Sequence, residues 1–284
     1  MTLSIVILAL FAAILPVFLW FFIFYRKSRA GFVSRFLIAF FFAALGGVAF
    51  WQNENFFFDF FAAHGVGIFV GFFALGAAIE YFKNFVVRIA GIRYFQNIDD
   101  VMDLSFAAAL GFTFGENFFH FLVAFSGNNP EVVGPLKLGK FILMRELYFL
   151  PIHLVTSGLF GYFYGVGIFA GDRLREKEKG RFFFRLFQKI FFWISEKKVF
   201  RAFKIFEGTF FSAVFYALFF GIAAKNPTIG DFLAAVGFSR WAIDENLLPV
   251  ISFVFFQVGT VALFSLLDKK RRWRHQNLLR ESEI

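Results

Sequence analysis

The chain has 284 residues, 59% of them hydrophobic, and a mean hydropathy of +0.69. A soluble domain of this length normally carries fewer apolar residues, so the composition predicts an integral membrane protein. The absence of cysteine excludes disulfides, thiolate nucleophiles and cysteine-based metal sites. The formal charge of +9 comes from basic residues between apolar segments rather than from a nucleic-acid-binding module, so no nucleic-acid partner is expected.

Several apolar runs are long enough to cross about 30 Å of hydrocarbon. They lie near residues 3–25, 35–51, 62–82, 104–126, 145–170, 204–224 and 247–267. We therefore expect an all-α, polytopic bundle of about seven transmembrane helices, with most of the 54 phenylalanines facing lipid. The first run has no basic segment before it and no persuasive cleavage site after it, so we interpret it as a retained helix.

The runs divide the chain into three parts. Residues 1–60 are expected to hold the first two spans, and residues 61–225 a core of spans three to six. Residues 226–284 are expected to hold the last span and a basic tail.

Lysine and arginine are unevenly distributed between alternate loops, which predicts the orientation in the membrane. Segments 26–35, 83–103, 171–204 and 268–284 contain 24 of the 29 basic residues. We expect these segments to be cytoplasmic, which places the N-terminus outside and the C-terminus inside. An acidic loop at residues 52–60, on the outside, agrees with this orientation.

The segment 172–204 combines arginine and lysine with phenylalanine and isoleucine at helical spacing. This pattern predicts an amphipathic helix lying on an anionic membrane surface. A cytoplasmic hairpin packed against the protein is the alternative.

Polar residues that interrupt the apolar runs are few and informative, because a charge costs about 3 kcal/mol or more at the bilayer centre. They are Glu80, Lys83, Glu116, Asn117, His120, Arg145, His153 and Glu207. Such residues usually face the interior of a bundle and mark a functional site.

Helical spacing predicts which of these side chains share a face. Glu80 and Lys83 are one turn apart and predict an ion pair. The apolar residues that follow favour a long third helix, which moves Glu80 toward the middle of the membrane. Glu116 and His120 are four residues apart, so that both can bind one metal ion or share a proton.

Two further spacings concern Asn117 on the fourth span and the polar residues of the fifth span. Asn117 points about 100° away from Glu116, toward a neighbouring helix. Arg145 and His153 are eight residues apart and share a face of the fifth span. A membrane histidine is also often only a hydrogen-bond partner between helices.

Two blocks of sequence resemble the PrsW family of intramembrane proteases, which are distant relatives of the CAAX prenyl endopeptidases. The first block is DLSFAAALGFTFGEN at residues 103–117, and the second is RELYFLPIHLVTSGLFG at residues 145–161. The family's Glu-Glu-x-x-Lys motif is present with Ile79 in place of its first glutamate. Its late histidine has no clear counterpart, and Glu207 stands nearest to that position.

The resemblance implies metal-assisted peptide hydrolysis inside a bacterial cytoplasmic membrane. It implies Glu80 as the general base, with Lys83, Asn117 and Arg145 as further catalytic-site residues. A divalent metal, expected to be zinc, would be held by His153 and Glu116, with His120 or Glu207 completing the set. The implied substrates are membrane-anchored proteins such as anti-sigma factors.

Two other functions fit the same residues. A catalytically silent relative would keep the fold to bind membrane partners, and the loss of the first glutamate at Ile79 favours it. An unrelated transporter would use Glu80, Glu116 and His153 as a path for protons or cations.

Overall fold

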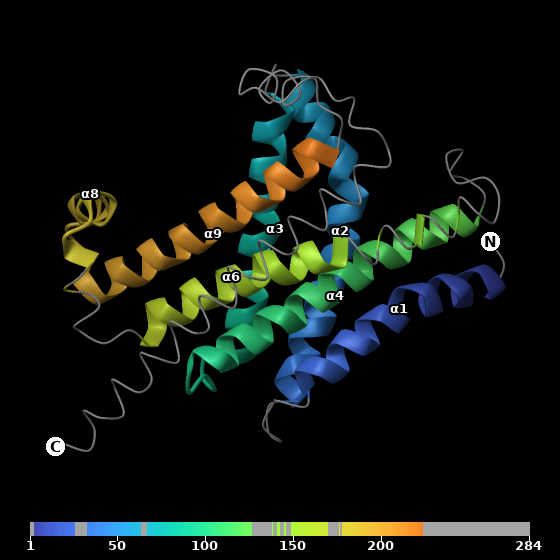
Figure 1. Ribbon diagram of the computed structural model, residues 1–284, viewed down its shortest axis with the longest axis horizontal. Coiled ribbons are helices and arrows are strands. Elements are labelled where there is room, and N and C mark those ends of the chain that lie inside the picture. Colours follow the sequence, from blue (N-terminus) through green and yellow to red (C-terminus); the bar gives the residue numbers. More distant parts are fainter. Residues whose placement is uncertain are drawn as a thin grey trace.

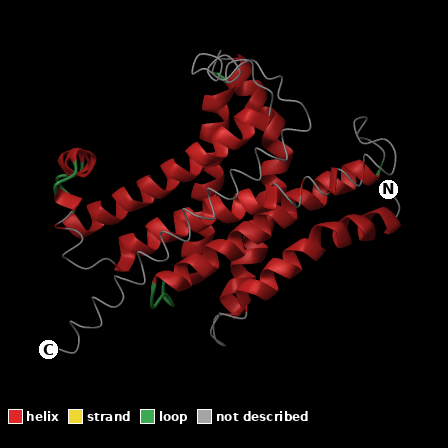
Figure 2. Ribbon diagram, in the orientation of Figure 1, coloured by secondary structure: helices red, strands yellow, loops and turns green. Residues whose placement is uncertain are grey.

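The computed structural model describes residues 3–25, 33–63, 67–126, 138, 141–142, 145, 149–169, 176 and 178–223. Within these ranges the protein is helical, with no strand (Figure 2). The helices are α1 (Leu3–Tyr25), α2 (Val33–Ala63), α3 (Ile68–Gly91), α4 (Ile98–Phe125), α6 (Leu150–Phe169), α8 (Phe182–Ile190) and α9 (Glu196–Ala223). The predicted all-α class is confirmed.

Helices α1, α4, α6 and α9 lie side by side in this order, and α2 and α3 cross them as a second layer (Figure 1). Helix α4 packs against α1, α2, α3 and α6, so it occupies the centre of the bundle. Most of its residues from Asp100 to Thr113 are buried. Asn117 is also buried and the Glu116 side chain is 13% exposed, so both point into the protein rather than into lipid.

A cap of polar groups fixes the start of α4. The Asn97 side chain accepts a hydrogen bond from the Asp100 backbone N–H at 3.0 Å, and the Asp100 carboxylate accepts one from the Gln96 N–H at 2.7 Å. These bonds satisfy N–H groups that have no partner inside the helix. Asp99 and Asp100 also place negative charge at the positive end of the helix dipole.

Glycines bring α2 and α4 into backbone contact. A Cβ atom at Gly111 would lie 2.0 Å from the Phe40 carbonyl oxygen, and one at Gly115 would lie 2.1 Å from that of Ala44. Only glycine permits this separation, as in the small-residue interfaces of other membrane helices. Since Glu116 and Asn117 follow Gly115 directly, this contact fixes the depth of both side chains.

Five described helices are long and apolar enough to cross a membrane. They are Val33–Asn53, Phe69–Gly91, Ile98–Phe125, Leu150–Phe169 and Glu196–Phe219, and α1 contributes a shorter apolar stretch, Leu3–Phe18. The chain is thus a polytopic helical membrane protein. The predicted span at 247–267 and the basic tail at 268–284 lie outside the described residues.

Two expectations about helix ends are settled by the structure. The long third helix is confirmed, because α3 continues to Gly91. The interpretation of residues 52–60 as a loop is wrong, because α2 continues without a break to Ala63. The acidic residues Glu54 and Asp59 do not interrupt the helix.

Segment 178–195 packs against the protein, as in the hairpin alternative, while its contact with a membrane surface stays a prediction. It contains the short amphipathic helix α8, and Phe184 of that helix is fully buried against Phe200 and Phe203 of α9. The opposite face of the segment exposes apolar side chains, including Phe183 and Trp193. Helix α8 is therefore packed against the protein on one side and presents an apolar surface on the other.

Candidate active site

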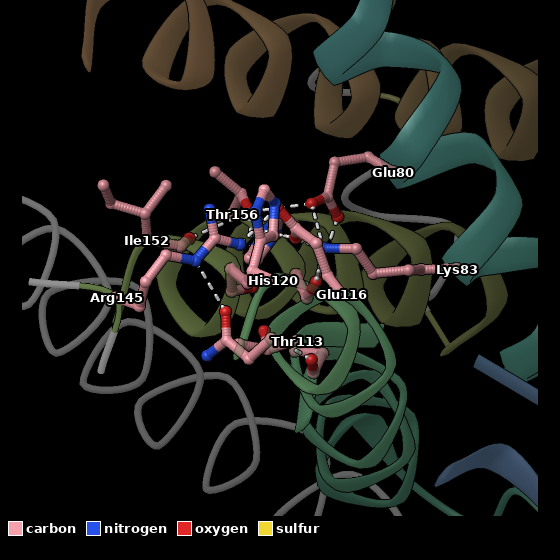
Figure 3. A network of polar contacts seen from close by, with 12 residues as sticks. Glu80, Lys83, Thr113, Glu116, His120, Arg145, Ile152 and Thr156 are labelled. Atoms are coloured by element: carbon pink, nitrogen blue, oxygen red, sulfur yellow. Dashed lines mark hydrogen bonds and ion pairs between the residues drawn. The ribbon is translucent and has the colours of Figure 1, made fainter. Parts of the chain in front are cut away.

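Except for Glu207, the polar residues predicted from the sequence meet where α3, α4, α6 and Arg145, which precedes α6, approach one another. Lys83 and Arg145 lie on opposite sides of the cluster, with Glu116 between them (Figure 3). Continuous polar contacts run from Glu80 through Lys83, His153 and Glu116 to Arg145. We refer to these five residues as the core network.

Glu80 and Lys83 form the α3 side of the core network. Lys83 Nζ lies 2.6 Å from Glu80 Oε1, and both side chains are about 1% exposed. This confirms the predicted ion pair. A buried charge is tolerated only with such a partner, since an unpaired one is strongly destabilising. Lys83 is therefore not a loop charge, although it falls within segment 83–103.

Hydroxyl groups from α6 hold the Glu80 carboxylate in place. Thr156 Oγ1 donates to Glu80 Oε1 at 2.7 Å, and Ser157 Oγ donates to Oε2 at 3.1 Å. Lys83 in turn donates to Ser157 Oγ at 2.9 Å. Oε1 thus accepts two short bonds while Oε2 accepts one longer bond, so Oε2 keeps the greater capacity to accept a further proton.

Arg145 forms the other side of the core network. It donates from Nη2 to Glu116 Oε1 at 2.7 Å and from Nε to Asn117 Oδ1 at 2.8 Å. Its guanidinium carbon lies 4.3 Å from the centre of the Phe149 ring. Asn117 points away from Glu116 on α4, as its spacing predicted, and the planar guanidinium group bridges the two side chains.

His153 connects the two sides of the core network. Its Nδ1 lies 3.2 Å from Lys83 Nζ, and its Nε2 lies 3.2 Å from Glu116 Oε2. A lysine ammonium group can only donate, so Nδ1 is the acceptor and the ring proton is assigned to Nε2, which donates to Glu116. Packing against Phe112 and Tyr216 keeps the ring in this orientation.

His120 lies beside the core network with an unused nitrogen. Its Nε2 is buried, has no hydrogen-bond partner and lies 3.9 Å from Glu116 Oε1. The ring contacts Trp51 and Phe141. Such an orphaned buried nitrogen normally costs stability, so its presence needs an explanation.

Glu116, His153 and His120 fit a divalent metal by donor type. Two imidazoles and a carboxylate are a common set for zinc, with bonds of about 2.0–2.1 Å, which places neighbouring donor atoms about 3.3 Å apart. The separations of 3.2 Å and 3.9 Å from Glu116 lie near this value. In the described ranges no three His, Asp or Glu side chains form a complete metal site as they stand, so the set must tighten to enclose an ion.

Glu207 belongs to a different cluster of charges. Its carboxylate lies 2.6 Å from Lys204 Nζ and 3.4 Å from Arg181, and Lys204 also pairs with Glu178 at 3.1 Å. These contacts attach the segment before α8 to α9. Nearby, hydrogen bonds to Glu176 and Glu196 raise the pKa of Lys179. That Glu207 binds a metal ion stays a prediction. Its observed ion pairs indicate a structural role, which is to hold the segment before α8 against α9.

Three further residues at the site were not predicted from the sequence. Ser157 bridges Glu80 and Lys83, and Ser212 of α9 donates to the Thr156 carbonyl oxygen at 2.7 Å. Trp51 packs against His120. The adjacent hydroxyl residues one turn after His153 were the available indication, because hydroxyls in an apolar run often bond to neighbouring helices.

Comparison with known proteins places the chain in a family. A family model described as PrsW family intramembrane metalloprotease matches residues 5–192, about two thirds of the chain. This range contains every residue of the core network. No curated protein and no solved structure matches the chain.

Proposed function

Since the chain belongs to the PrsW family of intramembrane metalloproteases, we propose that it hydrolyses peptide bonds of membrane-anchored proteins with a divalent metal held by the core network. The observation that carries this proposal is the contact of His153 with Glu116 on one side and with the Glu80–Lys83 pair on the other. A metal-ligand pair and a second carboxylate thus lie in one buried cluster. Single-span proteins such as anti-sigma factors are the proposed substrates, and zinc is the proposed metal.

Each residue of the site has a task in this proposal. Glu116 and His153 would hold the ion, and His120 would complete the ligand set with its free Nε2. To bind the ion, His153 Nε2 would give up the proton that it donates to Glu116, since a metal-bound nitrogen carries no proton. When bound, the ion polarises the scissile carbonyl and makes a water molecule more acidic. Arg145 keeps Glu116 oriented, and Asn117 keeps Arg145 in place. Glu80 accepts the water's proton at Oε2, the oxygen with fewer hydrogen bonds.

Lys83 balances the negative charge of Glu80 on the α3 side of the core network. With its three donors on Glu80, Ser157 and His153, it neutralises the carboxylate and fixes the position of the imidazole. A buried carboxylate is tolerated beside such a cation, whereas an unpaired buried charge is strongly destabilising.

The alternative of a catalytically silent relative has one observation in its favour. Ile79 stands where the family has its first glutamate, and its side chain is 3% exposed within the apolar core. A binding protein of the same fold would keep the core network as a structural element. Restoring the carboxylate with Ile79→Glu distinguishes a lost activity from one that uses Glu80 alone.

We expect the purified protein to contain about one divalent ion per chain, measured by elemental mass spectrometry. His153→Ala removes a direct ligand and should weaken metal binding by more than about 100-fold, because even partners one step removed from a metal contribute 10–100-fold. His275→Ala, in the C-terminal tail of the sequence, is the matched control. Equal metal content in folded wild type and His153→Ala would contradict the proposed ligand set.

We propose that the N-terminus is outside and the C-terminus cytoplasmic, because segments 26–35 and 171–204 are rich in basic residues. The chain has no cysteine, so single cysteines can be introduced without background. In intact cells, an impermeant thiol reagent should label a cysteine at the exposed Asn53 and should not label one at the exposed Gly180. Labelling at Gly180 from outside reverses the orientation.

A further inference from the structure

A second group of unsatisfied polar atoms lies away from the core network, between α6 and α9. Tyr164 is 1% exposed, and its hydroxyl has no partner at full hydrogen-bond geometry, although the Arg88 side chain lies close to it. Arg201 Nε is also buried without a partner. Burying such groups unpaired is unfavourable, so their occurrence at one place points to a ligand that satisfies them.

Helix packing brings these two residues to the same place. Gly167, one turn after Tyr164, lets α9 approach so closely that a Cβ there would lie 3.4 Å from the Arg201 Cα atom. The Tyr164 hydroxyl is also near enough to Arg88 of α3 for the charges of both Arg88 and Arg201 to act on it. Three helices thus direct two guanidinium groups and a hydroxyl toward one region.

No carboxylate neutralises these two arginines within the ranges that the structure describes. The ion pairs found there use Lys83, Arg145, Lys179, Arg181 and Lys204 as their lysine and arginine members. Two guanidinium groups without an acidic partner are suited to a phosphate, which accepts several charge-assisted hydrogen bonds.

An exposed apolar strip leads along α3 to this region. Tyr81, Phe85, Arg88, Ile89 and Ile92 follow at helical spacing and are exposed, with Phe85 at 54% and Ile89 at 57%. Arg88 lies in the last turn of α3, between Phe85 and Ile89 of the strip. The acyl chain of a phospholipid can cover these apolar side chains while the phosphate of its headgroup reaches Arg88 and Arg201.

We propose that Arg88, Tyr164 and Arg201 bind the headgroup phosphate of an anionic phospholipid. Basic pockets between transmembrane helices commonly recognise such headgroups. The apolar strip favours a lipid over free phosphate, because an acyl chain lying on Phe85 and Ile89 places its headgroup phosphate near Arg88. Tyr164 is eight residues beyond Thr156, about 12 Å along α6, so this site is separate from the core network.

The test is lipid binding to the purified full-length protein in detergent, measured as the shift of its thermal unfolding midpoint. Phosphatidylglycerol should stabilise the wild type more than phosphatidylcholine does. Arg201→Gln should weaken phosphatidylglycerol binding by roughly 10-fold or more, as expected for loss of a hydrogen bond to a charged group. Arg185→Gln, on the exposed part of α8, removes the same charge from a segment predicted to meet anionic lipid, and should weaken phosphatidylglycerol binding less than Arg201→Gln does.

Tyr164→Phe separates ligand binding from a structural role. Without lipid it should change the unfolding midpoint little, because the hydroxyl it removes has no partner at full hydrogen-bond geometry and the ring keeps its contacts with Phe95 and Phe160. With phosphatidylglycerol its midpoint should rise less than that of the wild type. Equal lipid binding by wild type, Arg201→Gln and Tyr164→Phe overturns the site. Stabilisation by inorganic phosphate but not by phosphatidylglycerol overturns the lipid assignment.

Discussion

Glu80→Gln should lower the rate of substrate cleavage by about 100-fold or more, because the amide cannot accept the water's proton. The substitution keeps the size of the side chain, and its carbonyl oxygen can still accept hydrogen bonds from Lys83 and Thr156. Folding should therefore change little. Initial rates on a single-span reporter in proteoliposomes, at matched protein amounts, measure the effect.

Glu176→Gln is the matched control for this substitution. The Glu176 side chain is 68% exposed and lies outside the core network, so its replacement should leave cleavage unchanged. If Glu80→Gln cleaves as fast as wild type, Glu80 is not the base, and the proton acceptor has to be sought elsewhere.

Lys83→Met should lower the free energy of unfolding by about 3 kcal/mol, because it leaves the Glu80 carboxylate buried without its counter-ion. It also removes the donor to His153 Nδ1, which frees the ring to rotate. The unfolding midpoint in detergent, followed by size-exclusion chromatography after heating, measures the loss. Lys189→Met, at an exposed position of α8, should be neutral.

The double variant Glu80→Gln with Lys83→Met distinguishes a charge effect from a packing effect. Since it removes both members of the buried pair, it should be more stable than Lys83→Met alone. If the double variant is as unstable as the single one, the loss comes from the missing side-chain volume, and the ion pair is not what Lys83 contributes.

Contacts within one helix were the most predictable part of this site. Helical spacing alone placed Lys83 beside Glu80, and it placed His120 on the face of Glu116, because residues three or four apart are neighbours on any helix. The direction of Asn117 toward another element followed from the same geometry. Apolar length likewise located the spans, since a helix in lipid must satisfy its own backbone groups.

Contacts between helices were not predictable in the same way. Nothing in the spacing of α3 and α6 indicates that Lys83 faces Nδ1 of His153, because that contact depends on how the two helices rotate and cross. The backbone contact at Gly111 and Gly115 depends on α2, which is distant in sequence. Glu207 shows the same difficulty, since its partner Arg181 comes from the segment before α8.

The most direct test of the proposed function is the cleavage of single-span reporters by the metal-loaded wild type in proteoliposomes, with products located by mass spectrometry. We expect cleavage within or next to the reporter's membrane span, loss of cleavage with a chelator, and loss of cleavage in His153→Ala. If the metal-loaded wild type cuts no member of a broad reporter panel and Ile79→Glu restores no activity, the protein is not a protease, and the core network serves only to hold the fold together.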